Sequence, residues 1–123
     1  MQDEDRAPSP LTPTTFHILL SLEQEVAHGY HIKRMVEGRT EGAVLLRAGT
    51  LYAALQRMSD DGQIEETDPP EDLEKEPNTR WRFYTITPVG RAVLRREIAR
   101  LESDLAAARA ILPATARAIA RHS

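Results

Sequence analysis

Apolar residues recur at three- and four-residue intervals through the first half of the chain, which is the spacing of amphipathic helices. The first such stretch opens at Thr12-Pro13, where the threonine can cap free N–H groups and the proline fits the first helical position. Its expected apolar stripe consists of Phe16, Leu19 and Leu20. The pattern therefore predicts a helix that starts at about Thr12.

A second helix is predicted after a turn around Glu25, and it runs to about Arg39. Its expected core contacts are Tyr30, Ile32, Met35 and Val36. Gly42 marks the loop that follows, and residues 44–46 are expected to form a short extended piece.

The third helix has the clearest pattern, and it is predicted to start near Gly49-Thr50. Leu51, Leu55 and Met58 fall at i, i+4 and i+7, on one narrow apolar face. At about 100° per residue, other residues point the opposite way, namely Ala53, Gln56, Arg57 and Asp60. Gly62 has the position of a C-terminal glycine, so the helix is expected to end there.

The periodicity then changes to that of strands. Residues 63–67 and 80–85 are the predicted strands, and the second is rich in β-favouring types from Trp81 onward. The loop between them holds three prolines and most of the acidic residues of this region. We predict a two-stranded hairpin with a long, solvated tip.

Thr87-Pro88 repeats the start signal of the first helix, and a long helix is predicted after it. Its apolar residues are spaced 4, 3, 4, 3 and 4 apart, as in the seam of a coiled coil, and they are Leu94, Ile98, Leu101, Leu105, Ala108 and Leu112. Pro113 is expected to interrupt the helix. A small domain can hardly cover so long a stripe, so a partner helix is favoured over packing against the chain's own first helix alone.

These elements divide the 123-residue chain into four parts. Residues 1–10 are expected to be a disordered tail, 11–87 a winged helix-turn-helix domain, 88–112 a C-terminal dimerisation helix and 113–123 a C-terminal tail. The expected fold class is mainly α with a small β-hairpin, a winged helix-turn-helix plus a long C-terminal dimerisation helix.

Composition changes this picture mainly through the placement of charge. The net charge is −3, yet residues 63–78 hold seven acidic residues and one lysine, so the rest of the chain is net positive. A locally basic surface is enough for phosphate contacts. The chain has no cysteine, no apolar run near the ~20 residues that span a membrane, and an acidic start unlike a signal peptide. We expect a cytoplasmic protein with no membrane partner.

A succession of short motifs carries a family resemblance. The motifs are Leu11-Thr12-Pro13 with Ile18-Leu19, His28-Gly29-Tyr30, the run GTLYAAL at 49–55, Gly62-Gln63-Ile64 and the run YTITPVGR at 84–91. In this order and at these spacings, from about Leu11 to Leu112, they resemble the PadR family of bacterial transcriptional regulators, in particular its smaller subgroup with a single C-terminal helix. The acidic hairpin loop departs from the pattern, since many relatives have a shorter or more basic turn.

The resemblance implies a winged-helix DNA-binding domain, a homodimer formed largely through the C-terminal helix, and usually repression. Relief by a small ligand, such as a phenolic acid or a drug-like aromatic, is common in that family. The expected partners are therefore double-stranded DNA, a second copy of the chain and a small aromatic effector.

The third helix is then the expected recognition helix, which lies in the major groove. The hydroxyls of Thr50 and Tyr52 are expected to reach phosphates, and the small Ala53 to permit close approach or to touch a thymine methyl. Gln56 is expected to pair with adenine and Arg57 with guanine. The alternative is a solvated polar face.

Two arginines at the base of the hairpin, Arg80 and Arg82, share one side of the strand with Tyr84 by period-two counting. They are expected to contact phosphates or the minor groove. The alternative is a pair of solvated arginines that balance the acidic loop.

Other chemistries are weakly supported. His17, His28 and His31 suggest a metal site, but no cysteine or matched carboxylate set completes one, so we expect no metal and no cofactor. Ser21, His17 and Glu23 lie on one helix without a reason to converge, and there is no glycine-rich phosphate loop, so we expect no enzyme.

The expected function is that of a sequence-specific transcriptional regulator, a repressor that acts as a homodimer on a pseudo-palindromic operator and is relieved by a small ligand. The alternative is a winged-helix protein-interaction module that no longer binds DNA. The acidic loop and the negative net charge support that alternative.

Overall fold

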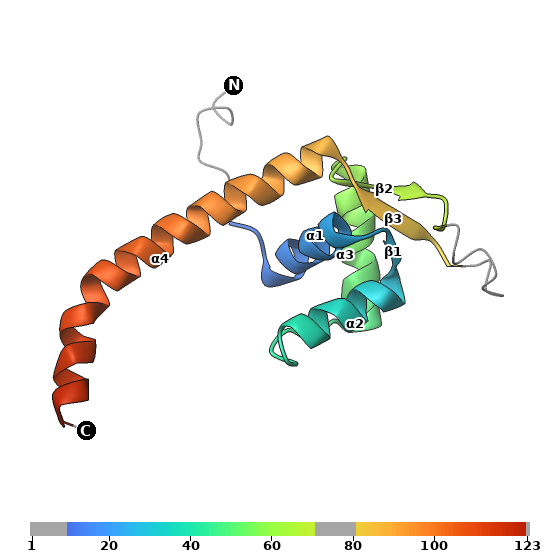
Figure 1. Cartoon of the computed structure of the whole chain (residues 1–123). Coiled ribbons are helices and arrows are strands. Elements are labelled where there is room, and N and C mark those ends of the chain that lie inside the picture. The colour runs from blue at the N-terminus through green and yellow to red at the C-terminus, as the bar shows by residue number, and fades with distance from the viewer. Residues whose placement is uncertain (1–9, 71–80, 123) are drawn as a thin grey trace.

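The computed structural model describes residues 10–70 and 81–122, and for 113–122 it describes the backbone alone. Within these ranges the elements follow the order α1 (Pro13–Gln24), β1 (Ala27–His28), α2 (Gly29–Arg39), α3 (Ala48–Asp60), β2 (Ile64–Thr67), β3 (Phe83–Ile86) and α4 (Pro88–His122). Three helices and a small sheet form the body of the molecule, and α4 projects away from it (Figure 1). The expected fold class, mainly α with a small β-hairpin and a long C-terminal helix, is confirmed.

Helix α1 begins as the sequence predicts. The Thr12 hydroxyl accepts the Thr15 N–H at 3.1 Å, and a proline occupies the first turn. The buried face differs from the expected stripe, because Ile18, Leu19 and Leu22 are buried whereas Phe16 and Leu20 are only partly covered. Helix α1 lies between the other elements, so a wider face of it is covered than one stripe predicts.

Helix α2 is capped by a histidine. His28 Nδ1 accepts the His31 N–H at 3.2 Å, which satisfies one free donor of the first turn. Ile32 and Val36 are buried as predicted. The predicted core contact at Tyr30 is wrong, because its side chain is 55% exposed and lies beside the His28 ring, on the outer side of the first turn.

The sheet has the strand order β1-β3-β2, and both pairings are antiparallel. Ile64 pairs with Ile86 at one end of β2, and Thr67 with Phe83 at the other, which confirms the expected hairpin with slightly different bounds. The third strand, β1, was not expected. The extended piece expected at 44–46 forms no strand, and it connects α2 to α3. The tip of the hairpin, 71–80, lies outside the described residues, as do residues 1–9 of the predicted N-terminal tail.

Helix α3 buries the predicted face, since Leu51, Leu55 and Met58 are each at most 2% exposed. It ends as expected, because Gly62 has a φ of 74°, the left-handed conformation that glycine adopts without steric cost. The Gln63 N–H closes this end by donating to the Met58 carbonyl at 2.9 Å.

A tight junction joins α3, the sheet and α4. The Thr87 hydroxyl donates to the Gly62 carbonyl and accepts the Gly90 N–H at 3.1 Å, while the Thr87 N–H donates to the Gln63 carbonyl at 3.1 Å. A Cβ on Gly90 would lie 2.0 Å from the Gln63 carbonyl oxygen. Only glycine therefore fits at this position without a backbone shift.

The C-terminal end of helix α4 differs from the prediction. It continues through Pro113 to His122, where a helix end at 112 and a tail at 113–123 were expected. Proline removes one backbone hydrogen bond but does not end a helix when the flanking residues favour it, and alanines surround Pro113. The first half of α4 packs against α1 and β3, and Leu94 belongs to the buried core.

Candidate nucleic-acid interface

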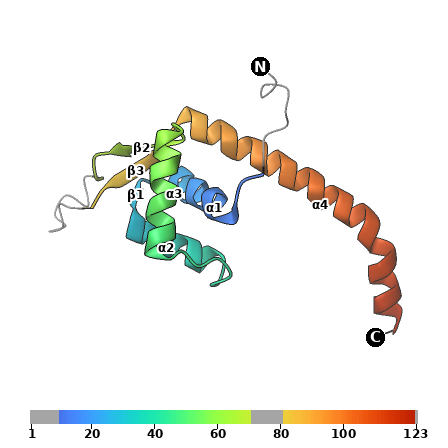
Figure 2. The same ribbon diagram turned by 180° about the vertical axis from the view of Figure 1, so that it is seen from behind.

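The outer face of α3 carries the side chains that the sequence singled out. Thr50, Tyr52, Ala53, Gln56 and Arg57 are all exposed. Helix α3 crosses α1 on the outside of the body, as the view from behind shows (Figure 2). One side of the molecule thus presents these five side chains to solvent.

Two of these side chains have partners within the chain. The Gln56 amide donates to Asp60 Oδ1 at 3.0 Å, one turn along α3. The Arg57 guanidinium donates to the Thr15 hydroxyl on α1 at 3.1 Å. Arg57 is therefore drawn toward α1, and its remaining N–H groups are the ones available to a ligand.

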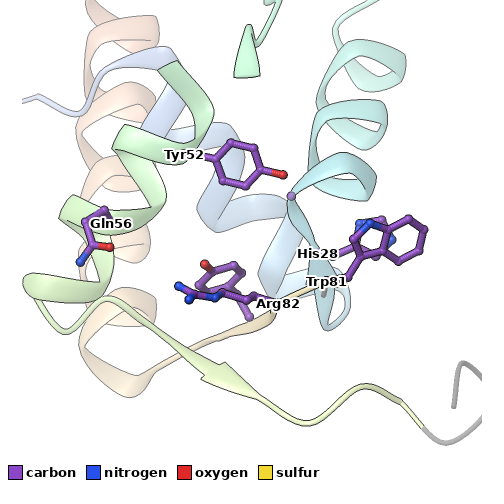
Figure 3. A pocket seen from close by; sticks show the side chains of 7 residues that line it. His28, Tyr52, Gln56, Trp81 and Arg82 are labelled. Carbon is purple, nitrogen blue, oxygen red and sulfur yellow. The ribbon is translucent and has the colours of Figure 1, made fainter. Parts of the chain in front are cut away.

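A pocket of about 330 Å³ lies where α3, the start of α2 and the segment entering β3 meet (Figure 3). Its lining consists of His28, Gly29, Tyr52, Gln56, Trp81, Arg82 and Tyr84. We call it the α3–wing pocket, where the wing is the pair of strands β2 and β3 with their connection. Of the residues predicted for DNA contact, the structure brings Tyr52, Gln56 and Arg82 together here, while Arg80 lies outside the described residues.

Tyr52 lies across the first residue of α2. A Cβ on Gly29 would come within 3.0 Å of the Tyr52 hydroxyl oxygen and 3.1 Å of its ring. The hydroxyl points toward this end of α2 in the close view (Figure 3). The glycine of the HGY motif thus leaves room for the tyrosine of the GTLY motif, a link between two sequence motifs that are more than twenty residues apart.

The wall of the pocket on the α2 side is aromatic. The rings of His28 and Trp81 lie 4.1 Å apart between centroids at 30°, and the His28 ring meets Phe83 edge-on at 5.2 Å. Figure 3 shows the indole and the imidazole overlapping. Sequence reasoning assigned Trp81 to a strand for its β-favouring side chain, and nothing in the sequence pairs it with His28.

The wall on the wing side is polar. The Arg82 Nε lies 3.5 Å from Glu66 Oε1, and both side chains influence the nearby Tyr84 phenol. Burial raises the pKa of the Tyr84 phenol, the nearby Glu66 carboxylate raises it further, and Arg82 opposes both effects. Tyr84 therefore remains a neutral hydroxyl at physiological pH.

Charge divides α3 into two ends. Acidic side chains cluster at its C-terminal end and on β2, namely Asp60, Asp61, Glu65 and Glu66. Arg47, at the N-cap position, is exposed and makes no side-chain capping bond. Sequence reasoning missed Arg47, although its position three residues before Thr50 at a predicted helix start was a usable signal.

The three histidines considered for metal binding have separate roles. His28 caps α2, and His31 Nε2 lies 3.0 Å from Glu25 Oε1. His17 Nδ1 lies 3.2 Å from the Arg39 guanidinium, and burial together with that cation lowers the pKa of His17. Across residues 10–70 and 81–122, no three His, Asp or Glu side chains are grouped as metal ligands.

The predicted seam of α4 divides into a covered and an exposed part. Leu94 is 3% exposed and packs in the chain's own core, so the structure moves it out of the predicted dimerisation set. The remaining residues are exposed, and we call them the α4 stripe: Ile98, Leu101, Leu105, Ala108 and Leu112. Leu105 is 49% exposed and Leu112 57%. A groove of about 190 Å³ between α1 and α4, beside Ile98, adjoins this stripe.

Residues 18–96, more than half of the chain, match the family model for the transcriptional regulator PadR-like family. This chain belongs to the PadR-like family of transcriptional regulators. The family expected from the motifs is thereby confirmed, and it is a family of transcriptional regulators and not of enzymes.

Solved structures share the fold of this PadR-like protein. A transcriptional regulator from Clostridium thermocellum is 24% identical, with a TM-score of 0.64 over 76% of this chain and 84% of that chain. A PadR family transcription regulator from Clostridium difficile is 22% identical, with a TM-score of 0.67 over 82% of this chain and 99% of that chain. Bacillus subtilis PadR, in complex with operator DNA, is 20% identical, with a TM-score of 0.59 over 71% of this chain and 46% of that chain. No curated protein matched the chain.

Within the part of the chain that the structure describes, no helix is both long enough and apolar enough to cross a membrane.

Proposed function

We propose that this PadR-like protein is a homodimeric, sequence-specific DNA-binding repressor that acts on a pseudo-palindromic operator. The observation that carries the proposal is the exposed polar face of α3 beside the α3–wing pocket. In a helix-turn-helix the N-terminal part of the recognition helix meets base edges. The structure of Bacillus subtilis PadR with operator DNA supports this use of the shared fold.

The charges of α3 favour one orientation on DNA. The N-terminal half presents Arg47, Thr50 and Tyr52, while the acidic residues gather at the C-terminal end. Phosphates favour both the cation and the free N–H groups of a helix N-terminus. We therefore place α3 in the major groove with its N-terminal half closest to the phosphates, Ala53 and Gln56 toward base edges and Arg47 as an additional contact.

Arg57 and Gln56 are the proposed base readers with the sharpest chemistry. Gln56 matches the edge of adenine, and Arg57 matches guanine. To reach a base, Gln56 must release or share its hydrogen bond with Asp60. Arg57 must do the same with its hydrogen bond to Thr15. Arg80 and Arg82 are the proposed wing contacts.

The proposed dimer forms through the α4 stripe. Exposed apolar residues at coiled-coil spacing are a cost in water that a second copy of the helix removes. Two α4 helices related by a two-fold axis would carry two α3 helices to half-sites about one helical turn, ~10 bp, apart or a multiple of it. A small aromatic effector bound in the cleft of such a dimer is the proposed means of relief.

In vitro selection of duplexes from random DNA by the full chain, at near-physiological salt, tests the proposal. We expect an enriched inverted repeat, and a steep loss of affinity for it as salt rises, since phosphate contacts release counterions. A protein that is folded and dimeric yet enriches no sequence would overturn the proposal. It would favour a protein-interaction module, for which the exposed Glu65, Glu66 and Asp68 at the wing offer the surface.

Gln56→Ala and Arg57→Ala separate base reading from phosphate binding. Each should cost about 1–3 kcal/mol on the selected operator and much less on random DNA. Equal losses on both duplexes would assign these side chains to the backbone instead. Arg34→Ala, at an exposed arginine of α2, is the matched control for the loss of one charge.

A further inference from the structure

The α3–wing pocket gathers hydrogen-bond donors from separate elements of the chain. Tyr52 and Gln56 come from α3, Arg82 precedes β3, and Tyr84 lies within it. The two phenol hydroxyls and the guanidinium are groups that hold DNA phosphates in known complexes, while the Gln56 amide borders them as the proposed base reader. The pocket also opens beside the face of α3 that we place on DNA, so the DNA backbone would pass over it.

One carboxylate already engages the cation of this pocket. Glu66 Oε1 lies 3.5 Å from Arg82 Nε, and the two side chains are 56% and 70% exposed. Both side chains therefore lie largely in solvent, where an ion pair is weak and can exchange partners. The carboxylate offers the guanidinium the same chemistry as a phosphate, two oxygen acceptors with negative charge.

We propose that the α3–wing pocket binds one phosphodiester of the DNA backbone. In the absence of DNA, Glu66 pairs with the Arg82 guanidinium, and the phosphate replaces the Glu66 carboxylate when DNA binds. The inference rests on the proposed function, and it names the group that fixes α3 relative to the backbone. Because the pocket spans α3 and the wing, one bound phosphate would fix the position of both elements relative to the DNA backbone. Glu66 would act as a competitor that lowers affinity for every DNA sequence alike.

The arrangement at Gly29 supports this assignment. A Cβ on Gly29 would crowd the Tyr52 ring and hydroxyl, so the glycine leaves the space in which Tyr52 borders the pocket. A phosphate in the pocket would therefore meet the Tyr52 hydroxyl at the pocket's edge.

The test compares the affinities of full-length variants for the selected operator and for a random duplex of equal length, across a series of KCl concentrations. Arg82→Ala should weaken binding to both duplexes by a similar factor, and it should reduce the slope of log K against log salt by about one. Arg96→Ala, which removes the same charge from an exposed position on α4, is the control. Equal slopes for the two variants would overturn the proposal.

Glu66→Gln tests the competition directly. Removing the carboxylate should tighten binding to both duplexes by about two- to fivefold, the strength typical of an exposed ion pair. Glu65→Gln removes the same charge from the neighbouring exposed residue, whose side chain points to the other face of β2. A gain of equal size in both variants, or a Glu66→Gln gain that persists with Arg82→Ala, would overturn the role of Glu66.

Tyr52→Phe removes only a hydroxyl, and Tyr30→Phe does the same at an exposed tyrosine outside the pocket. We expect the first change alone to weaken binding to both duplexes. Operators with single methylphosphonates then locate the phosphate, because one neutral position per half-site should weaken the wild type but not Arg82→Ala. If no position distinguishes the two proteins, the pocket holds no phosphate.

Different outcomes contradict the proposed function and the phosphate pocket. A wild-type protein that enriches no DNA sequence contradicts the proposed function. A wild-type protein that selects an operator, while Arg82→Ala matches Arg96→Ala and Tyr52→Phe matches Tyr30→Phe, contradicts only the phosphate pocket.

Discussion

The two halves of α4 carry the same heptad spacing but meet different surroundings. In the first half Leu94 is buried, Arg91 pairs with Glu23 of α1 at 2.7 Å, and the helix packs on α1 and β3. In the second half, every residue from 101 to 112 is exposed. One sequence pattern is thus covered within the chain at one end and left exposed at the other, where we propose that a second chain covers it. Periodicity identifies an apolar seam but not the partner that covers it.

The largest effect is expected in the covered half. Leu94→Ala should lower the free energy of unfolding by about 2–5 kcal/mol, because it removes buried methyl groups and leaves a cavity in the shared core. Urea denaturation of the full chain measures this. A loss below about 1 kcal/mol would mean that the first half of α4 is not anchored to the body as the structure describes.

The exposed half should respond through association instead. Leu105→Asp places a charge in the α4 stripe, and it should raise the dimer Kd by about a hundredfold, about 2.7 kcal/mol, while the monomer stays folded. Sedimentation equilibrium and circular dichroism separate the two effects. Ser103→Asp puts the same charge on an exposed position outside the stripe, and it should leave the mass unchanged. A variant that still sediments as a dimer would remove the α4 stripe from the interface.

The start of α4 gives an effect of intermediate size. Gly90→Ala forces a Cβ against the Gln63 carbonyl, so it should destabilise the fold by roughly 1–3 kcal/mol as the backbone shifts. Gly38→Ala is the matched control, since a Cβ there meets open space inside helix α2. That change should stabilise by about 0.5–1 kcal/mol. Thermal unfolding of both variants decides whether the junction is as tight as the distances indicate.

The smallest effect concerns pH, at the boundary between the two halves. Hydrogen bonds from Arg100 lower the pKa of Glu97 below its ordinary value of 4.5, against the opposing effect of burial. The folded chain then binds fewer protons than the unfolded one, so this stabilisation is full above pH 4.5 and is lost as pH falls through the folded pKa. Glu97→Gln should flatten the pH dependence of the urea midpoint in this range. If Glu102→Gln, at an exposed position on the same helix, flattens it equally, the Arg100 contact is not the cause.

Much of the fold follows from local signals in the sequence. Thr12-Pro13 and Thr87-Pro88 mark two helix starts, and the stripe of Leu51, Leu55 and Met58 identifies the buried face of α3. Such signals act within a few residues, so they are visible in the sequence alone. Strand β1 is different, because two residues have no periodicity and form a strand only by pairing with β3.

The candidate interface was predictable as a face but not as a pocket. Helical geometry alone assigns Gln56 and Arg57 to the surface of α3. The partners of these and other polar residues lie elsewhere in the fold: Arg57 bonds to Thr15, and Tyr52 rests on Gly29. These contacts depend on how α1, α2 and α3 pack together, and no spacing within one helix contains that information.

Thr87 has a mechanical consequence for such a regulator. Its hydroxyl and N–H bond the segment that follows α3 to the start of α4, so we expect the two helices to move together. In a dimer held by α4, the crossing angle of the two long helices would then act as a lever on the distance between the two α3 helices. A rotation of each α4 by about 10° at the crossing, acting over the ~15 Å from Ile98 to Pro88, would shift the attached end of α3 by about 2–3 Å. Operator spacing would thus be set by the geometry of a coiled coil far from the DNA, and a ligand that altered that angle would release both half-sites together.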